Sequence, residues 1–404
     1  MGLLCDPFIW SDNWWIDNDK AWFIDGIRNI LFCLDLNAHL CEMAIGIPDE
    51  NQITFRLTPI CIKCGSDIFC MPGFGRSIWV YNLDEHQFTQ VCIDELDNVQ
   101  WTFDYWVFEN KIYAIAKLTN KLLEINVTEK KLRYHTICEG DVIVSSAKVG
   151  NTIYCLSEQT ERVYAYNLLT QKVAQHLIPY IGKKLSLMCF DGKKFWLSGY
   201  CKEIYVWDKE TNLIMLIDDF PRDFGVYNFN ADCKDVLNCA INEFENPTFY
   251  NSVEIGDYIW FIPYETNKII YVNKHTHKLK VLEVDEDIET KESILASCQF
   301  SLTHKYLVEY VKDNRFLGLY SIKNACILEI DAIELKYQWH DYGFSEKCLM
   351  QCGKINQDVY YEQRILDREV YKFMVQENSR NEHDRCMSSI GTGIYEEMIK
   401  PVLE

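Results

Sequence analysis

Hydrophobic and polar positions alternate along this chain in short runs, and the clearest example lies between Ile143 and Ile178. Four β-rich runs follow one another there, and a short polar segment separates each run from the next. Alternation with a period of two is typical of strands, and connections this short join antiparallel neighbours. The segment therefore predicts a four-stranded meander, with strands at Ile143–Val149, Thr152–Ser157, Arg162–Asn167 and Lys172–Ile178.

The same unit recurs along the chain as an aromatic-rich second strand, a loop and a third strand that usually ends in Asn or Asp. The second strands centre on Phe23, Phe69, Tyr113, Tyr154, Trp196, Trp260 and Leu307. Five of the six intervals between these centres are 41–47 residues long, and the sixth is 64 residues long. Repetition at a nearly fixed period is the signature of a repeat architecture, here with seven units.

A four-stranded unit of this size cannot bury both of its faces alone, whereas a ring of such units closes without long exposed edges. We therefore predict an all-β fold, a seven-bladed β-propeller of four-stranded antiparallel meanders. The runs Ile-Tyr-Cys-Leu at 153–156 and Val-Tyr-Ala-Tyr-Asn at 163–167, with their equivalents over residues 14–330, resemble the kelch-like branch of the β-propeller superfamily. The double glycine of kelch repeats is missing, and Trp207-Asp208 is the one pair that resembles the WD signature.

Two segments depart from the repeat and set the predicted domain boundaries. The propeller is expected over residues 1–334, with a long loop insertion at 218–250 whose many aromatic residues either anchor it on the blades or form a stacking platform. Residues 335–404 form the second predicted part, a mixed or helical extension packed on the propeller. The apolar residues that have a helical spacing in this part are Val359, Leu366, Val370 and Phe373.

Charge and cysteine usage narrow the choice of partner and compartment. The formal net charge of −20 is spread along the chain and would repel duplex nucleic acid and anionic membranes. The 18 cysteines lie mostly in strand-like apolar runs, which favours free buried thiols in a reducing compartment. With no signal peptide and no long apolar stretch in the sequence, we expect a cytoplasmic protein without membrane contact.

A basic residue precedes or begins the third strand of every predicted unit. Because these loops open on one mouth of a propeller channel, converging cations there would bind a small anionic ligand or an acidic peptide. The alternative is that the same residues are ordinary solvated flanks of strands. The candidate ligand-binding residues are Arg28, Arg76, Lys121, Arg162, Lys202, Lys268 and Arg315.

Other motifs are weaker. Cys61 and Cys64 have metal-like spacing, but a strand would place them on opposite faces, so core thiols are expected. His275 and His277 fall where a hairpin turn is predicted. His340, followed by Asp341 and Tyr342, is the best acid/base candidate, but no nucleophile is signalled nearby. We therefore predict no catalytic residue, no metal site and no cofactor.

Two functions remain open at this stage. A non-catalytic recognition or scaffold module would bind a protein or peptide partner on the loop face of the propeller, and the lack of a catalytic motif favours this hypothesis. The alternative is an enzyme with its site at the channel mouth, acting on an anionic sugar or peptide. Residues that converge only in space would be needed for it.

Overall fold

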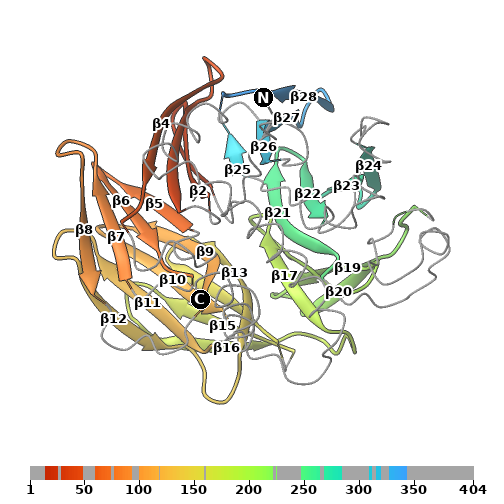
Figure 1. Cartoon of the computed structure of the whole chain (residues 1–404). Helices are drawn as coiled ribbons and strands as arrows, with labels where there is room; N and C mark the ends of the chain where they lie inside the picture. The colour runs from red at the N-terminus through yellow and green to blue at the C-terminus, as the bar shows by residue number, and fades with distance from the viewer. Residues whose placement is uncertain are drawn as a thin grey trace, which may run out of the picture.

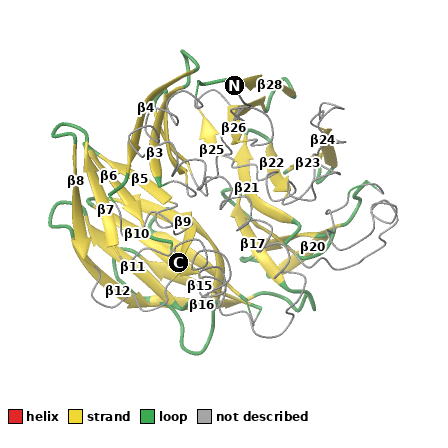
Figure 2. Ribbon diagram, in the orientation of Figure 1, coloured by secondary structure: helices red, strands yellow, loops and turns green. Residues whose placement is uncertain are grey.

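The computed structural model describes residues 14–25, 29–48, 60–73, 77–92, 100–117, 119–158, 161–221, 224, 247–263, 268–283, 309–311, 315–319 and 327–343. These residues form 28 strands and no helix (Figures 1 and 2). The strands make seven four-stranded antiparallel sheets, each built from consecutive strands. Within the described part of the chain, no helix is long and apolar enough to cross a membrane.

We number the sheets one to seven along the chain. Sheets one to three contain β1 (Trp14–Asp17), β2 (Lys20–Asp25), β3 (Ile30–Asp35) and β4 (Leu40–Gly46), then β5 (Ile60–Cys64), β6 (Asp67–Met71), β7 (Ser77–Asn82) and β8 (Gln87–Cys92), then β9 (Gln100–Phe108), β10 (Lys111–Lys117), β11 (Lys121–Asn126) and β12 (Lys131–Thr136). Sheets four and five contain β13 (Ile143–Val149), β14 (Thr152–Ser157), β15 (Arg162–Asn167) and β16 (Val173–Leu177), then β17 (Leu185–Phe190), β18 (Phe195–Gly199), β19 (Ile204–Asp208) and β20 (Leu213–Ile217). Sheets six and seven contain β21 (Phe249–Ile255), β22 (Tyr258–Pro263), β23 (Lys268–Asn273) and β24 (Leu279–Glu283), then β25 (Glu309–Val311), β26 (Arg315–Leu319), β27 (Ile327–Asp331) and β28 (Lys336–His340).

The sheets follow one another around a ring, with the first strand of each sheet toward the centre and the fourth strand outside (Figure 1). First strands contact their neighbours, as β13 does with β17 and β17 with β21, and β25 returns to contact β1. This arrangement confirms the predicted all-β propeller. Each described sheet uses one continuous stretch of chain, so sheets one and seven meet without exchanging a strand.

Apolar side chains fill the interfaces between successive sheets, in six clusters from the pair of sheets one and two to the pair of sheets six and seven. The aromatic residues at the centres of the second strands are part of this core, and Phe69, Trp196 and Trp260 are fully buried. Replacing one such aromatic residue with Ala typically costs about 3–5 kcal/mol. The ring is therefore held together by contacts between sheets.

Every third strand ends at an Asp or Asn whose side chain folds the following turn. In sheet four, Asn167 Oδ1 accepts hydrogen bonds from the backbone N–H groups of Leu169 and Thr170, at 3.1 and 2.8 Å. The fourth residue after the Asp or Asn has a positive φ, between 50° and 57°, in all seven sheets. Asp and Asn suit this position because their short side chains bond to the backbone of the next residues. The seven turns begin at Asp35, Asn82, Asn126, Asn167, Asp208, Asn273 and Asp331.

The seventh unit differs from its prediction by one strand. Residues 306–308, expected as its second strand, lie outside the described residues, and Arg315–Leu319, near the expected third strand, is the second strand β26. The expected fourth strand at Cys326–Ile330 corresponds to the third strand β27, which ends at Asp331. Strand β28, Lys336–His340, lies beyond the predicted boundary at residue 334, where a mixed or helical extension was expected.

The other predicted departures are described only in part. Residues 344–404, which carry the predicted helical spacing, lie outside the described residues, as does most of the 218–250 insertion. The described ends of the insertion pack on the ring: Phe224 and Phe249 are buried in the cluster between sheets five and six, and Phe220 packs against it. These aromatic residues anchor the insertion on the sheets.

Candidate functional site at the meeting of sheets one and seven

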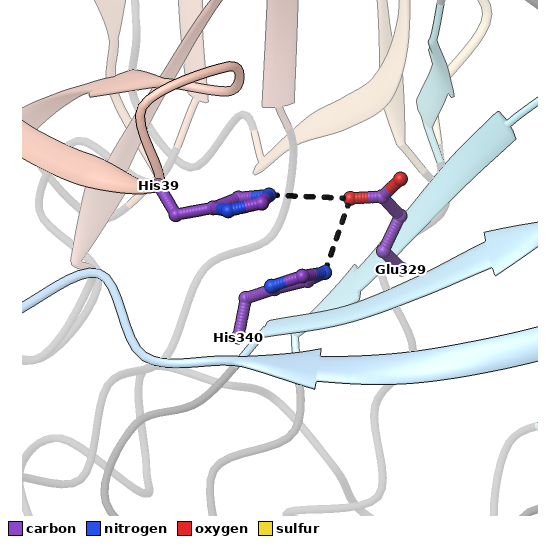
Figure 3. Close-up of side chains that lie close together, drawn as sticks. All are labelled: His39, Glu329 and His340. Carbon is purple, nitrogen blue, oxygen red and sulfur yellow. Dashed lines mark ion pairs between the residues drawn. The ribbon is translucent and has the colours of Figure 1, made fainter.

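Sheets one and seven meet through backbone and side-chain contacts between residues far apart in the chain. The backbone N–H of Cys41 in β4 donates a hydrogen bond to the carbonyl oxygen of Tyr342, just after β28, at 2.8 Å. Beside this bond lie His39, Glu329 and His340 (Figure 3). We call these three residues the seam cluster, because they lie where the two ends of the ring meet.

Local structure positions each member of the seam cluster. His39 occupies the positive-φ position of the turn after β3, with φ of 50°. Glu329 is the middle residue of β27, and His340 is the last residue of β28. In the register of these paired strands His340 lies opposite Ile327, two residues from Glu329, so both side chains emerge on one face of the sheet.

Both imidazoles point to the same carboxylate oxygen. Nε2 of His340 lies 3.4 Å from Oε2 of Glu329, and Nε2 of His39 lies 3.7 Å from the same oxygen (Figure 3). The two imidazole rings are stacked, with centroids 3.8 Å apart and planes 17° apart. The His39 side chain is 38% exposed and that of His340 13%, so the cluster opens to solvent on the His39 side.

Tyr342 supports the cluster from the protein interior. Its buried ring stands at 87° to the His39 ring, with centroids 5.5 Å apart. Burial, together with the nearby Glu329 carboxylate, raises the pKa of the Tyr342 phenol well above its usual range. The phenol therefore stays neutral.

A second copy of the glutamate–histidine pair occurs in sheet three. Glu124 and His135 occupy the positions of β11 and β12 that Glu329 and His340 occupy in β27 and β28. His135 Nε2 lies 3.0 Å from Glu124 Oε2, and Lys111 Nζ lies 2.8 Å from Glu124 Oε1. In the next sheet of the ring, Gln171 has the turn position that His39 has in sheet one. The seam cluster thus has an imidazole at a place where the copy in sheet three has a Gln.

The donor atoms of the seam cluster lie within 4.8 Å of one another, which is close enough for one metal ion to contact all three residues. Two imidazoles and a carboxylate are ligands of divalent transition metals. His340 was predicted from the sequence as an acid/base candidate, no metal site was expected, and neither His39 nor Glu329 was predicted. The available signal was that His39, His86 and His277 share the same turn position after a third strand.

Four of the predicted basic residues lie at equivalent places on one rim of the ring. Lys121, Arg162 and Lys268 begin the third strands β11, β15 and β23, and Lys202 precedes β19 by two residues. The Lys268 side chain is 12% exposed, and its Nζ is 3.9 Å from the Glu283 carboxylate. Lys121 Nζ lies 5.7 Å from the centre of the Tyr134 ring.

Within the described part of the chain, none of the other three predicted basic residues is placed on this rim. Arg28 and Arg76 lie outside the described residues. Arg315 begins β26, the second strand of sheet seven, and not a third strand as predicted. Because turns between first and second strands lie on the rim opposite to the loops between second and third strands, Arg315 belongs to the other rim.

The weaker motifs have structural roles. Cys61 is buried in the cluster between sheets one and two, whereas Cys64 packs on the cluster between sheets two and three. This confirms that the two thiols face opposite sides of β5. His275 and His277 lie in the turn after β23, where the His275 ring is 3.2 Å from Asp257 and the His277 ring packs on Trp196.

A second surface stands out at the outer edge of sheets four and five. Their outer strands β16 and β20 expose aliphatic side chains: Leu177 is 62% exposed and Leu216 46% exposed. The exposed residues of β12, by contrast, are Lys131, Arg133 and Thr136, and those of β24 are Lys280 and Glu283. The large apolar residues that are exposed in the described part of this region are Leu169, Val173, Leu177, Tyr180, Leu213 and Leu216.

No family model matches this chain, and no curated protein matches it. Among solved structures, the chain is similar to a streptogramin B lyase, at 12% identity and a TM-score of 0.56, covering 83% of this chain and 94% of the lyase. It is also similar to the dihydro-heme d1 dehydrogenase NirN, at 11% identity and a TM-score of 0.51, covering 83% of this chain and 66% of the other. A third similar structure is PorZ, a surface component of the type-IX secretion system of Porphyromonas gingivalis, at 10% identity and a TM-score of 0.50, covering 83% of this chain and 38% of PorZ.

These similarities define the class of fold, a β-propeller. At 10–12% identity they carry no more than the fold, and the names of the similar proteins range from a lyase to a secretion-system component. The narrower resemblance to the kelch-like branch stays a prediction. Function must therefore be argued from the surfaces of this chain.

Proposed function

We propose that this chain is a non-catalytic recognition module that binds a protein partner through the outer edge of sheets four and five. The observation that carries the proposal is a pair of outer strands in adjacent sheets, β16 and β20, whose exposed side chains include aliphatic residues and no charged residue. From the sequence, a partner was predicted on the loop face. We call the exposed sides of β16 and β20 the apolar edge. Because of it, we place the proposed binding surface on the side of the ring.

An exposed outer strand offers its unpaired backbone groups to any other strand, and proteins usually protect such edges with charges. Strands β12, β24 and β28 follow this rule, since each exposes at least one Lys, Arg or Glu. Strand β16 exposes only Val173, Ala174, Gln175 and Leu177. An edge left apolar in a protein with a net charge of −20 is suited to binding, and an extended apolar segment of a partner could pair with it.

The apolar edge adjoins the rim that carries the predicted basic residues. Leu177 lies directly opposite Arg162 in the register of β15 and β16, so both are on the same face of sheet four. Tyr180, just beyond β16, is an exposed aromatic residue of the type that often dominates binding energy. A partner on this edge would therefore contact an apolar centre with a cation at its border. The basic residues would orient the partner.

The proposal also includes the predicted number of blades, the kelch-like class and the predicted cytoplasmic location. The seven sheets would act as the seven blades of one closed, kelch-like ring in the cytoplasm. Support for a reducing compartment comes from burial, because eight of the nine cysteines whose side chains the structure describes are buried. Burial raises the pKa of Cys33 to about 12, as expected of a thiol that belongs to the core.

Photo-crosslinking in cells tests where a partner binds. A photoreactive amino acid would replace Leu177 in one variant and Leu216 in a second, and Ile333, which is 69% exposed on a turn of sheet seven, in a control variant. The proposal predicts one discrete crosslinked protein that is shared by positions 177 and 216 and is absent at position 333. Equal crosslinking at all three positions, or none at 177 and 216, would overturn it.

A further inference from the structure

We propose that the seam cluster of His39, Glu329 and His340 binds one divalent transition-metal ion, with Zn²⁺ as the model case, and that this ion clasps the first and last sheets of the ring. The site lies far from the apolar edge in the fold, because it joins sheets one and seven. It does not depend on the proposed function.

The distances within the cluster suit a metal ion better than hydrogen bonds. The Nε2–Oε2 distances of 3.4 and 3.7 Å exceed the usual 2.7–2.9 Å of a charge-assisted hydrogen bond. Ligands about 2.1 Å from a tetrahedral metal ion lie about 3.4 Å from one another. The equivalent pair in sheet three, Glu124 and His135, is at 3.0 Å, within the hydrogen-bonding range. The two copies of the motif therefore differ in spacing.

The stacked rings must open slightly for a shared ion. The lone pair of Nε2 lies in the plane of its ring, and two nearly parallel rings direct their lone pairs side by side and not at one point. Glu329 and His340 are held on paired strands, whereas the more exposed His39 is on a turn. A rotation of the His39 ring about its side-chain bonds would bring the two lone pairs together.

The ligand types define the class of ion. Imidazole suits Zn²⁺, Cu²⁺, Ni²⁺ and Co²⁺, whereas Mg²⁺ and Ca²⁺ prefer sites made of oxygen atoms. Three protein ligands leave a fourth position of a tetrahedral ion to water, and the solvent-exposed side of the cluster provides room for it. The Glu329 carboxylate offsets part of the charge of the ion.

The structural consequence is a connection between the two ends of the ring. His39 and Glu329 are about 290 residues apart in the chain, so the unfolded chain does not hold them together. An ion that binds only the folded ring stabilises it by mass action. The bound ion would connect sheets one and seven, which meet without exchanging a strand.

The test compares thermal unfolding of the full chain in the presence and absence of ZnCl₂, after treatment with a chelator. At 100 times the dissociation constant, a single site in a protein of this size is expected to raise Tm by about 3 °C. His39→Asn should abolish the rise and keep the fold, because Asn212 occupies the same turn position in sheet five. His86→Asn, at the same position in sheet two, is the matched control and should respond like the natural sequence.

Cobalt provides a second readout that does not depend on stability. Co²⁺ should show visible d–d absorption with the natural sequence and with His86→Asn, and lose it with Glu329→Gln. Glu124→Gln controls for the removal of a glutamate from the same motif. A Tm rise that persists in both His39→Asn and Glu329→Gln, or an absence of Zn²⁺ and Co²⁺ binding by the natural sequence, would overturn the proposal.

Discussion

Gly199, at the end of β18, lies very close to the backbone of Lys184, just before β17. A Cβ atom at this position would lie 1.8 Å from the carbonyl oxygen of Lys184 and 2.9 Å from its carbonyl carbon. Its own carbonyl oxygen accepts a hydrogen bond from the Thr248 N–H at 2.8 Å. Because backbone lies on both sides, no flexible side chain can move away to make room.

Gly199→Ala should therefore destabilise the protein by about 3 kcal/mol or more, since the added methyl group forces the backbone apart. Gly46→Ala is the control, because a Cβ atom there meets nothing within 4 Å and φ is not positive. The midpoints of urea unfolding measure both changes. Equal midpoints for the two variants would contradict the close approach.

Glu124 is a residue at which pH should affect stability. Burial raises the pKa of this carboxyl, but the hydrogen bonds from Lys111 and His135 outweigh burial, and the pKa falls below its ordinary value of 4.5. A carboxyl with a lowered pKa in the folded state contributes stability that is fully present above its unfolded pKa. That stability is lost as the pH falls through the folded pKa.

Glu124→Gln should consequently be less stable than the natural sequence at pH 6, and the difference should shrink as the pH falls below about 4.5. Urea unfolding at a series of pH values measures the difference. A gap that stays constant from pH 6 to pH 3 would show that the charge of Glu124 makes no contribution.

The repeated element of the fold is the turn after each third strand. Asn167→Ala removes the side-chain acceptor of the Leu169 and Thr170 N–H groups and should cost about 1 kcal/mol. Asn167→Asp should be nearly neutral, because Asp occupies the same position in sheets one, five and seven. The midpoints of urea unfolding measure both changes. A higher midpoint for Asn167→Ala than for Asn167→Asp would contradict the role of the side chain.

The same element explains which strands could be predicted from the sequence. In sheets one to six an aromatic second strand and an Asp or Asn at the end of the third strand follow each other at regular intervals, and the predicted strands lie where the structure has them. In sheet seven the predicted third strand, Leu317–Ser321, ended at a Ser and not at an Asp or Asn, and most of it belongs to the second strand β26. Asp331, with Leu335 at the positive-φ position, was the correct marker.

At the scale of the whole molecule, the sequence predicted the ring but not the residues that meet where it closes. The period of the repeat implies a closed architecture, since each sheet needs a neighbour on both faces. The meeting of His39 with Glu329 and His340 depends on the angle at which sheet one returns to sheet seven, and no local pattern encodes that angle. The apolar edge became visible only when the exposure of β16 and β20 was compared with that of the other outer strands.

The central claim is that the edge of sheets four and five is the binding surface. The most direct measurement is the affinity of the purified crosslinked partner for the natural sequence, for Leu177→Lys and for Ile333→Lys. A lysine on the edge buries an unpaired charge in the complex, so Leu177→Lys should weaken binding by about 30-fold or more, whereas Ile333→Lys should leave it unchanged. Unchanged affinity for Leu177→Lys, with both variants folded, would contradict the account.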